Sequence, residues 1–444
     1  MQTVTIQTEF IKLDSFLKFC GAVGTGGEAK TVIAEGEVQV NGEPCTMRDA
    51  GRRKLAGGCS VKLRRLKTEN FRNLAAVDLV PGPGVNVIYG ENAQGKTNLI
   101  EAIYLLTGQK SFRAAKESDY LRFGTGVARI EAEFTCQNRE KTAALAFGSK
   151  KLAWLSGVEC TPGELTGEFL AVVFSPGELA LIQEGPAERR AFLDGAISQV
   201  MPRYMATLAA MSRILLQRNT LITDMQKSGN TAMMEPLLET WDRSLARAAF
   251  SVCHARARFL RRLAPPAAEI YRDICKREDQ PFSLTYQPSI PAPGGCDWAD
   301  ITPAEGEAHI RAALAAARNE DYKNYCTTIG PHRDNMEVSI AGISARSFGS
   351  QGQQRSCALA LKLAQCRVME ETLGEAPIIL LDDVLSELDK TRRDYFLHGK
   401  HPGQVFITCC DRNAARTLGG GAAFRMKEGQ LYLPGERAKK RKEP

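Results

Sequence analysis

The segment from Gly90 to Thr97, with the sequence GENAQGKT, restricts the possible folds of this chain more than any other stretch. It fits the pattern G-x-x-x-x-G-K-[ST], in which the backbone N–H groups of a glycine-containing loop surround phosphate oxygens at the start of a helix. Residues 85–89 before it read as a short strand and residues 98–106 after it as a helix, which is the context that this loop requires. We therefore predict a nucleotide-binding α/β fold.

Each residue of the segment has an expected part in binding ATP. Lys96 reaches the β- and γ-phosphates and is assigned a catalytic role, and the hydroxyl of Thr97 is a ligand for Mg²⁺. The other residues line the phosphate loop: Gly90, Glu91, Asn92, Ala93, Gln94 and Gly95.

Two neighbouring carboxylates follow the apolar run 378–381. A buried parallel strand delivers such residues to the carboxyl edge of a sheet, where nucleotides bind. Asp382 suits the Mg²⁺ shell, and Asp383 is placed to orient or polarise the attacking water. Taken alone, an apolar run that ends in Asp-Asp is also typical of a plain strand end.

A third candidate element is Ser350-Gln-Gly352-Gln353-Gln-Arg355, which precedes a strongly helical run over 356–368. Serine and glycine at a helix start leave N–H groups available for an anion. By itself this stretch is equally a capped helix. The Ser-Glu-Leu-Asp sequence at 386–389 could likewise be only an N-cap box for the next helix.

Composition excludes several classes of protein. The 444 residues carry a net charge of +7, and the last eight residues hold five Lys or Arg against one Glu, so the body is nearly balanced. The apolar runs are far shorter than the ~18 residues of a membrane helix. The start lacks a secretory pattern. Thirteen scattered cysteines suit a reducing compartment. We expect a cytoplasmic protein with no membrane partner; association with the nucleoid is implied only by the resemblance described below.

The pattern along the chain divides it into five parts. Strand-like segments cover 66–73, 77–80, 130–134 and 143–155. A long helical and Arg-rich pattern covers 187–275, and 281–303 is rich in loops before a helix over 305–319. In residues 1–63, alternation at 38–40 before Asn41-Gly42 predicts a two-residue hairpin. The predicted parts are 1–63, 64–186, 187–304, 305–436 and a basic tail at 437–444.

Four motifs described above resemble the ATPase head of the ABC/SMC superfamily when they are taken in chain order. They are the phosphate loop at 90–97, the signature helix that begins at 350–355, the acidic strand at 378–383 and the short loop at 386–389. The closer resemblance is to the RecF family of bacterial recombination mediators. It rests on residues 66–73, 90–98, 174–176, 189–194, 330–334, 350–355, 381–389 and 404–408.

The resemblance implies an ABC/SMC-type head with a helical lobe inserted, and two ATP molecules buried in a homodimer. Ser350, Gly352 and Gln353 of one copy would cap the γ-phosphate held by the other. It also implies DNA binding at gaps, slow DNA-stimulated hydrolysis that acts as a switch, and loading of a RecA-type recombinase through a RecR-type mediator. Arg72 and Asn73 resemble residues that touch the nucleotide, although a strand-end turn also explains them.

The chain departs from transporter ATPases at two positions. No Gln-bearing loop is recognised near residues 174–176, and Thr408 stands where transporters have a switch histidine. The γ-phosphate sensor is therefore unassigned. A transporter-type ATPase subunit is kept as an alternative function.

Residues 1–63 resemble a small α+β, S-four-like RNA-binding domain, and their basic patch is Arg48, Arg52, Arg53 and Lys54. The patch favours contact with nucleic-acid phosphates, without distinguishing RNA from DNA. A factor bound to RNA or the ribosome through this domain is a further alternative. The arginines at 243, 247, 256, 258, 261 and 262 are equally a DNA-binding stripe or a solvated helix face.

Overall fold

The computed structural model describes residues 59–384 without 114, 115, 230, 277 and 278, together with 403–410, 421–433 and a few isolated positions, namely 17, 25, 39, 40, 43, 44 and 393. The predicted basic patch at Arg48, Arg52, Arg53 and Lys54, the loop 386–389 and the tail 437–444 lie outside these residues.

A mostly parallel sheet forms the centre of the head, in the order β11-β16-β17-β6-β18-β19. Its strands are β6 (Val85–Tyr89), β11 (Ala171–Phe174), β16 (Ile378–Leu381), β17 (Val405–Cys409), β18 (Ala422–Lys427) and β19 (Gln430–Tyr432). Only the β18–β19 pairing is antiparallel. Strands β11, β16 and β17 are buried along their whole length, which explains why they read as continuous apolar runs.

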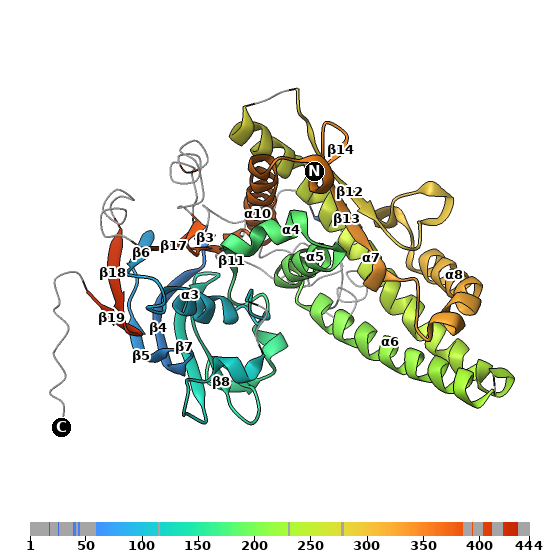
Figure 1. Cartoon of the computed structure of the whole chain (residues 1–444), viewed down its shortest axis with the longest axis horizontal. Helices are drawn as coiled ribbons and strands as arrows, with labels where there is room; N and C mark the ends of the chain where they lie inside the picture. The colour runs from blue at the N-terminus through green and yellow to red at the C-terminus, as the bar shows by residue number, and fades with distance from the viewer. Residues whose placement is uncertain are drawn as a thin grey trace.

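A second, antiparallel sheet lies beside it in the order β10-β9-β8-β7-β4-β5. The helix α3 (Lys96–Leu105) contacts strands of both sheets, as Figure 1 also shows. Because both of its sides are covered, Leu99, Ile100 and Ile103 are fully buried. The strands are β4 (Lys62–Phe71), β5 (Leu74–Leu79), β7 (Ala128–Cys136), β8 (Arg139–Phe147), β9 (Leu152–Leu155) and β10 (Val158–Cys160).

A helical lobe extends away from the two sheets (Figure 1). It contains α5 (Pro186–Val200), α6 (Arg203–Ser228), α7 (Thr231–Cys275) and α8 (Pro303–Asn324), with the short α4 (Ala180–Gln183) before them. A small antiparallel sheet packs on α7 and consists of β12 (Phe282–Gln287), β13 (Asn335–Ile340) and β14 (Ile343–Ser344). No helix among the described residues is long and apolar enough to cross a membrane.

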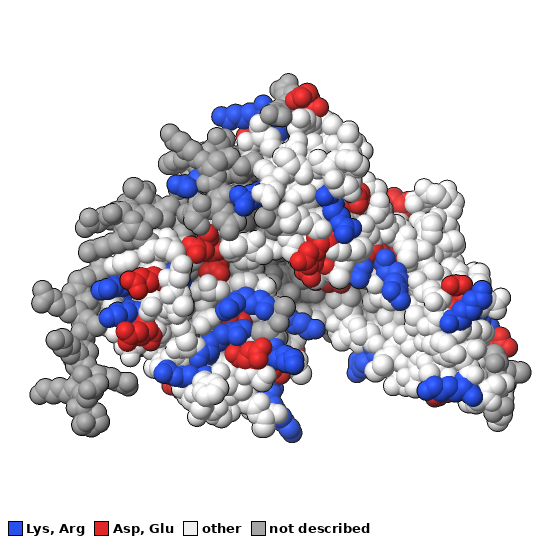
Figure 2. All heavy atoms as spheres, viewed as in Figure 1, with Lys and Arg blue, Asp and Glu red and all other residues white. Residues whose placement is uncertain are grey.

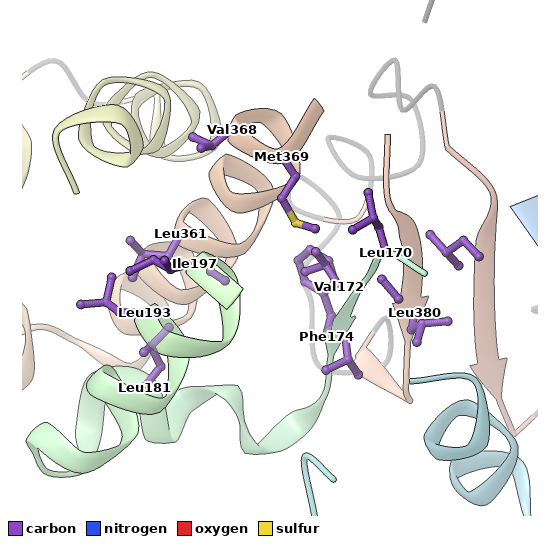
Figure 3. Close-up of a cluster of buried hydrophobic side chains, with 14 of the residues drawn as sticks. Leu170, Val172, Phe174, Leu181, Leu193, Ile197, Leu361, Val368, Met369 and Leu380 are labelled. Atoms are coloured by element: carbon purple, nitrogen blue, oxygen red, sulfur yellow. The ribbon is translucent and has the colours of Figure 1, made fainter. Parts of the chain in front are cut away.

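Helix α10 (Gln351–Leu373) connects the lobe to the head, and the short α9 (Ala345–Phe348) precedes it. Figure 3 shows its side chains Leu361 and Met369 directed toward α5 and β11 respectively. Both residues are buried, together with Ile197 of α5 and Val172 of β11. This packing fixes the direction of α10 and thereby the position of its first turn.

Among the described residues, three short strands lie before β4, and one of them, β3, pairs with a strand of the head. Strand β3 (Cys59–Ser60) pairs in parallel with β15 (Glu375–Ala376), which directly follows α10. Strands β1 (Gln39–Val40) and β2 (Glu43–Pro44) pair with Val40 opposite Glu43, as expected for a two-residue hairpin.

The predicted α/β head with an inserted helical region is confirmed, and one local expectation was wrong. The loop-rich interval 281–303 also contains one strand, β12 (Phe282–Gln287), which sequence reasoning did not find. Residues 143–155 are not one strand: β8 and β9 pair as a hairpin with Ala146 opposite Leu152.

The centre of the helical lobe is held by a buried arginine. Arg218 of α6 donates to Asp242 of α7 at 2.8 Å and to Asp321 of α8 at 2.7 Å. All three side chains are buried, so removing the guanidinium leaves Asp321 without this ion pair and Asp242 with Arg318 alone, at 3.0 Å. We expect Arg218→Ala to lower the free energy of unfolding by ~3–5 kcal/mol. Urea denaturation measures this, with Arg213→Ala on the exposed face of α6 as the control. A loss below about 1 kcal/mol would contradict the expectation.

Candidate nucleotide-binding site

The strand order brings the predicted site residues together. Strand β17 lies between β6, which leads into the phosphate loop, and β16, which leads into the two acids. The three strands are parallel, so their carboxyl ends share one edge of the sheet. Residues separated by almost 300 positions in the sequence thereby meet at Thr97 and Asp382, whose side chains are hydrogen-bonded at 2.9 Å.

The two glycines of the loop are required by close contacts. Gly95 has φ 109°, and a Cβ there would lie 2.7 Å from Oδ1 of Asn73. A Cβ on Gly90 would lie 2.3 Å from the carbonyl oxygen of Met426. Ala93 also has a positive φ, of 63°. The loop is therefore tightly curved, as a phosphate-binding loop must be.

Lys96 is held inside this curve. Its Nζ donates to the backbone oxygens of Gly90 at 2.6 Å and Glu91 at 2.8 Å, and the residue is only 6% exposed. The ammonium group thus lies over the loop itself rather than in solvent. It can reach phosphate oxygens by exchanging these carbonyl contacts for stronger, charge-assisted ones.

Thr97 and Asp382 fit a magnesium ion. A hydroxyl and a carboxylate are the hard oxygen ligands that Mg²⁺ prefers, with the remaining positions left to water and phosphate. Burial raises the pKa of Asp382, while hydrogen bonds from Thr97 and Thr408 act in the opposite direction. A divalent cation would offset the cost of burying this carboxylate. The described residues contain no group of three or more acidic, Cys or His side chains that could hold a metal by themselves.

Asp383 has an unusual backbone for a residue with a side chain, with φ 57°. Its N–H donates to the hydroxyl of Thr408 at 2.9 Å. The Sγ of Cys410 lies 3.9 Å from each of its carboxylate oxygens and 4.0 Å from Nζ of Lys96. Asp383 and Lys96 therefore face a common region beside Cys410.

The loop is supported from two sides. The Nδ2 of Asn73 donates to the carbonyl of Ala93 at 3.3 Å, so Asn73 lies against the loop, while its contact with a nucleotide stays a prediction. The carbonyl of Gln94 accepts a hydrogen bond of 3.0 Å from the N–H of Gly429, in the turn between β18 and β19. Asn92 accepts from the thiol of Cys410 at 3.1 Å.

Arg72 is engaged with a buried acid rather than with the loop. Its guanidinium forms two hydrogen bonds of 2.7 Å with the carboxylate of Glu101, which is completely buried on α3. Arg113 lies 3.5 Å from the same carboxylate. In this structure Arg72 links the end of β4 to α3 through Glu101, and its contact with a nucleotide stays a prediction.

Ser350 is the N-cap of α10, and its capping box with Gln353 is formed. Ser350 lies on the surface, and Gly352 and Gln353 are half-buried. Nearby Phe348 is 78% exposed. The signature segment is thus presented outward.

Three of the six arginines that were candidates for a DNA-binding stripe are paired with acids of the lobe. Arg256 is buried against Asp194, Arg261 pairs with Asp297 and Asp300, and Arg247 lies 3.7 Å from Glu307. On the face shown in Figure 2, basic and acidic side chains of the described residues are interspersed. The pairing favours a structural part for these three, whereas Arg243, Arg258 and Arg262 are exposed and both alternatives stay open for them.

Three residues at the site were missed by the sequence reasoning or assigned no role. In the sequence, Thr408 is identified only as the residue that stands where transporters have a histidine. Cys410 belongs to no motif, and Glu101 has the appearance of an ordinary helix residue. Each acquires its place only through contacts with distant segments.

Comparison with known proteins agrees with this geometry. A family model described as the RecF/RecN/SMC N terminal domain matches residues 62–428, and one described as an S4 domain matches residues 4–69. The chain is 38% identical over 384 residues to the DNA replication and repair protein RecF of Heliobacterium modesticaldum, covering 85% of this chain and 100% of that protein. It is 34% identical over 374 residues to RecF of Acetivibrio thermocellus, covering 83% and 99%. A solved structure described as the recombination mediator protein RecF-ATP in the RecFOR pathway superposes with a TM-score of 0.78 at 31% identity, covering 86% of this chain and 99% of that one.

Proposed function

The chain belongs to the RecF family of DNA replication and repair proteins, and from that premise we propose that it is an ATP-driven, DNA-binding switch of recombinational repair and replication-fork maintenance. ATP binding joins two copies on DNA at a gap, and slow, DNA-stimulated hydrolysis releases them. The bound dimer helps a RecR-type mediator to load a RecA-type recombinase at the nucleoid.

One observation carries the proposal: Lys96, Thr97, Asp382 and Asp383 lie together at the ends of neighbouring parallel strands. Lys96 binds phosphate oxygens. Thr97 and Asp382 would hold Mg²⁺, which when bound neutralises charge that develops on the phosphates. Asp383 orients the attacking water and accepts its proton as the oxygen attacks the γ-phosphorus and the bond to the ADP oxygen breaks.

The outward position of the signature segment supports the dimer. Ser350 is exposed at the start of a 23-residue helix, whose N-terminal dipole favours an anion. In the segment that leads into this helix, Phe348 and Ile343 are 78% and 54% exposed, and a second copy would cover such apolar side chains. We propose that Ser350, Gly352 and Gln353 act on the nucleotide of the partner copy.

Light scattering with and without ATP, and with gapped DNA, tests this function. We expect a monomer alone and a dimer with ATP and Mg²⁺, more so on gapped DNA. Ser350→Arg should prevent the dimer while the monomer's affinity for ATP changes less than about threefold, because only the partner's nucleotide meets this residue. The control is Ser212→Arg on the exposed face of α6. A Ser350→Arg protein that dimerises as the wild type does would contradict an action in trans.

The N-terminal module adds a second nucleic-acid contact to the proposal. The S4 domain match to residues 4–69 supports a binding role for the part predicted as 1–63. Its phosphate contacts are assigned to Arg48, Arg52, Arg53 and Lys54, and its ligand is RNA or DNA. The domain boundaries at 63/64, 186/187, 304/305 and 436/437 stay predictions. The extent of the RecF matches favours repair over the transporter-ATPase alternative.

A further inference from the structure

The strand order places Thr408 between the phosphate loop and the two acids. Any residue near the carboxyl end of β17 lies between the phosphate loop after β6 and the acids after β16. Thr408 pairs with Ile88 of β6, and its neighbour Ile407 pairs with Leu381 of β16. The side chain is buried, with 1% exposure.

The hydroxyl of Thr408 contacts both acids at once. It accepts the N–H of Asp383 at 2.9 Å and lies 3.0 Å from Oδ1 of Asp382, to which it can donate. The carbonyl of Leu381 is a second acceptor at 3.4 Å. A hydroxyl has a single proton to donate, and here that proton is directed to Asp382, so it is not left to donate to a phosphate oxygen.

The contact with Asp383 explains an otherwise unfavourable backbone. An L-residue with a side chain rarely adopts a φ of 57°, and such a conformation persists only where the surroundings fix it. The hydrogen bond from its N–H to Thr408 is a fixing contact. The preceding residues of β17, Val405, Phe406 and Ile407, are all apolar. A valine at 408 would suit the strand equally well, so the hydroxyl is the distinguishing feature of this side chain.

We propose that Thr408 is a positioning residue for ATP hydrolysis: its hydroxyl holds the backbone of Asp383 and the carboxylate of Asp382 in the arrangement that hydrolysis needs. Thr408 stands where transporter ATPases have their switch histidine. Its proposed role differs, because its hydroxyl is bonded to the two acids and not to a phosphate. The inference rests on the proposed function, since it concerns the same acids.

The test compares Thr408→Val and Thr408→Ala, which lack the hydroxyl, with Thr408→Ser, which keeps it. Single-turnover hydrolysis should fall by about 30- to 100-fold in Val and Ala, because small displacements of catalytic groups cost rates of this order. The dissociation constant for ATP should change less than about threefold, because Lys96 and the loop are untouched. Thr408→Ser should recover hydrolysis to within about threefold of wild type.

Thr68→Val is the matched control. Thr68 is also buried on a strand, and its hydroxyl has no hydrogen-bond partner in the structure. It lies on β4, away from the acids, so its replacement should leave hydrolysis unchanged.

Each alternative result has a definite reading. Wild-type hydrolysis by Thr408→Val, or parallel losses of ATP affinity and hydrolysis, would overturn the positioning role, and so would failure of both the Val and Ala variants to fold. Measuring Asp383→Asn in the same assay distinguishes a failure of the Thr408 inference from a failure of the proposed function. If it is inactive while Thr408→Val is normal, only this inference fails. If it hydrolyses ATP normally, the assignment of Asp383 in the proposed function fails.

Discussion

Replacing Lys96 with alanine is expected to remove measurable ATP binding and, with it, ATP-dependent dimerisation. The ammonium is the one side-chain cation that the structure places within the curve of the described loop, bonded to two of its carbonyls. Without it, the negative phosphates would meet the backbone oxygens of Gly90 and Glu91 with no side-chain cation of the loop between them. Charge-assisted hydrogen bonds to phosphate are about twice as strong as neutral ones. We expect ATP affinity to fall at least about 100-fold, which corresponds to ~2.7 kcal/mol.

Titration with a fluorescent ATP analogue measures the loss, and light scattering measures the dimer. Lys67→Ala, which removes an exposed lysine from β4, is the control and should bind ATP normally. The Lys96→Ala protein should stay folded, since the lysine makes no buried ion pair with an acid among the described residues. A variant that still dimerises with ATP would show that the phosphates are bound elsewhere.

The phosphate loop and the acidic strand could be predicted because local chemistry constrains them. Gly95 cannot carry a Cβ without meeting Asn73, and β16 must be apolar because it is buried on both faces. These requirements produce a recognisable pattern of residue types within the eight residues 90–97 and within the six residues 378–383. The predicted strands at 85–89 and 378–381 match β6 and β16 to the residue for the same reason.

The other parts of the site depend on which segments meet, and a single sequence does not contain that information. Arg72 pairs with Glu101 only because α3 packs on β4, and Arg256 is neutralised by Asp194 of a different helix. An arginine-rich pattern has the same appearance whether its partners are phosphates or distant carboxylates. Thr408 likewise gains a role only through the order β16-β17-β6.

Asp383→Asn is expected to separate ATP binding from hydrolysis. The amide has the same shape as the carboxylate and leaves the backbone N–H bonded to Thr408, so the left-handed conformation at this residue is retained. What it loses is the ability to accept a proton from water. General-base contributions are about 100- to 10,000-fold, so we expect single-turnover hydrolysis to fall by at least about 100-fold.

Because the ATP-bound state then persists, the Asp383→Asn protein should accumulate as a dimer. ATP affinity should be equal to or slightly tighter than that of the wild type, since one negative charge near the phosphates is removed. Light scattering over time distinguishes the variant, whose dimer lasts, from the wild type, whose dimer decays as ATP is consumed. The control is Asp78→Asn, which alters an exposed carboxylate paired with Arg65 on β4. If Asp383→Asn stayed monomeric in saturating ATP, nucleotide binding alone would not drive association, and the partner's Ser350 would have no part in completing the site.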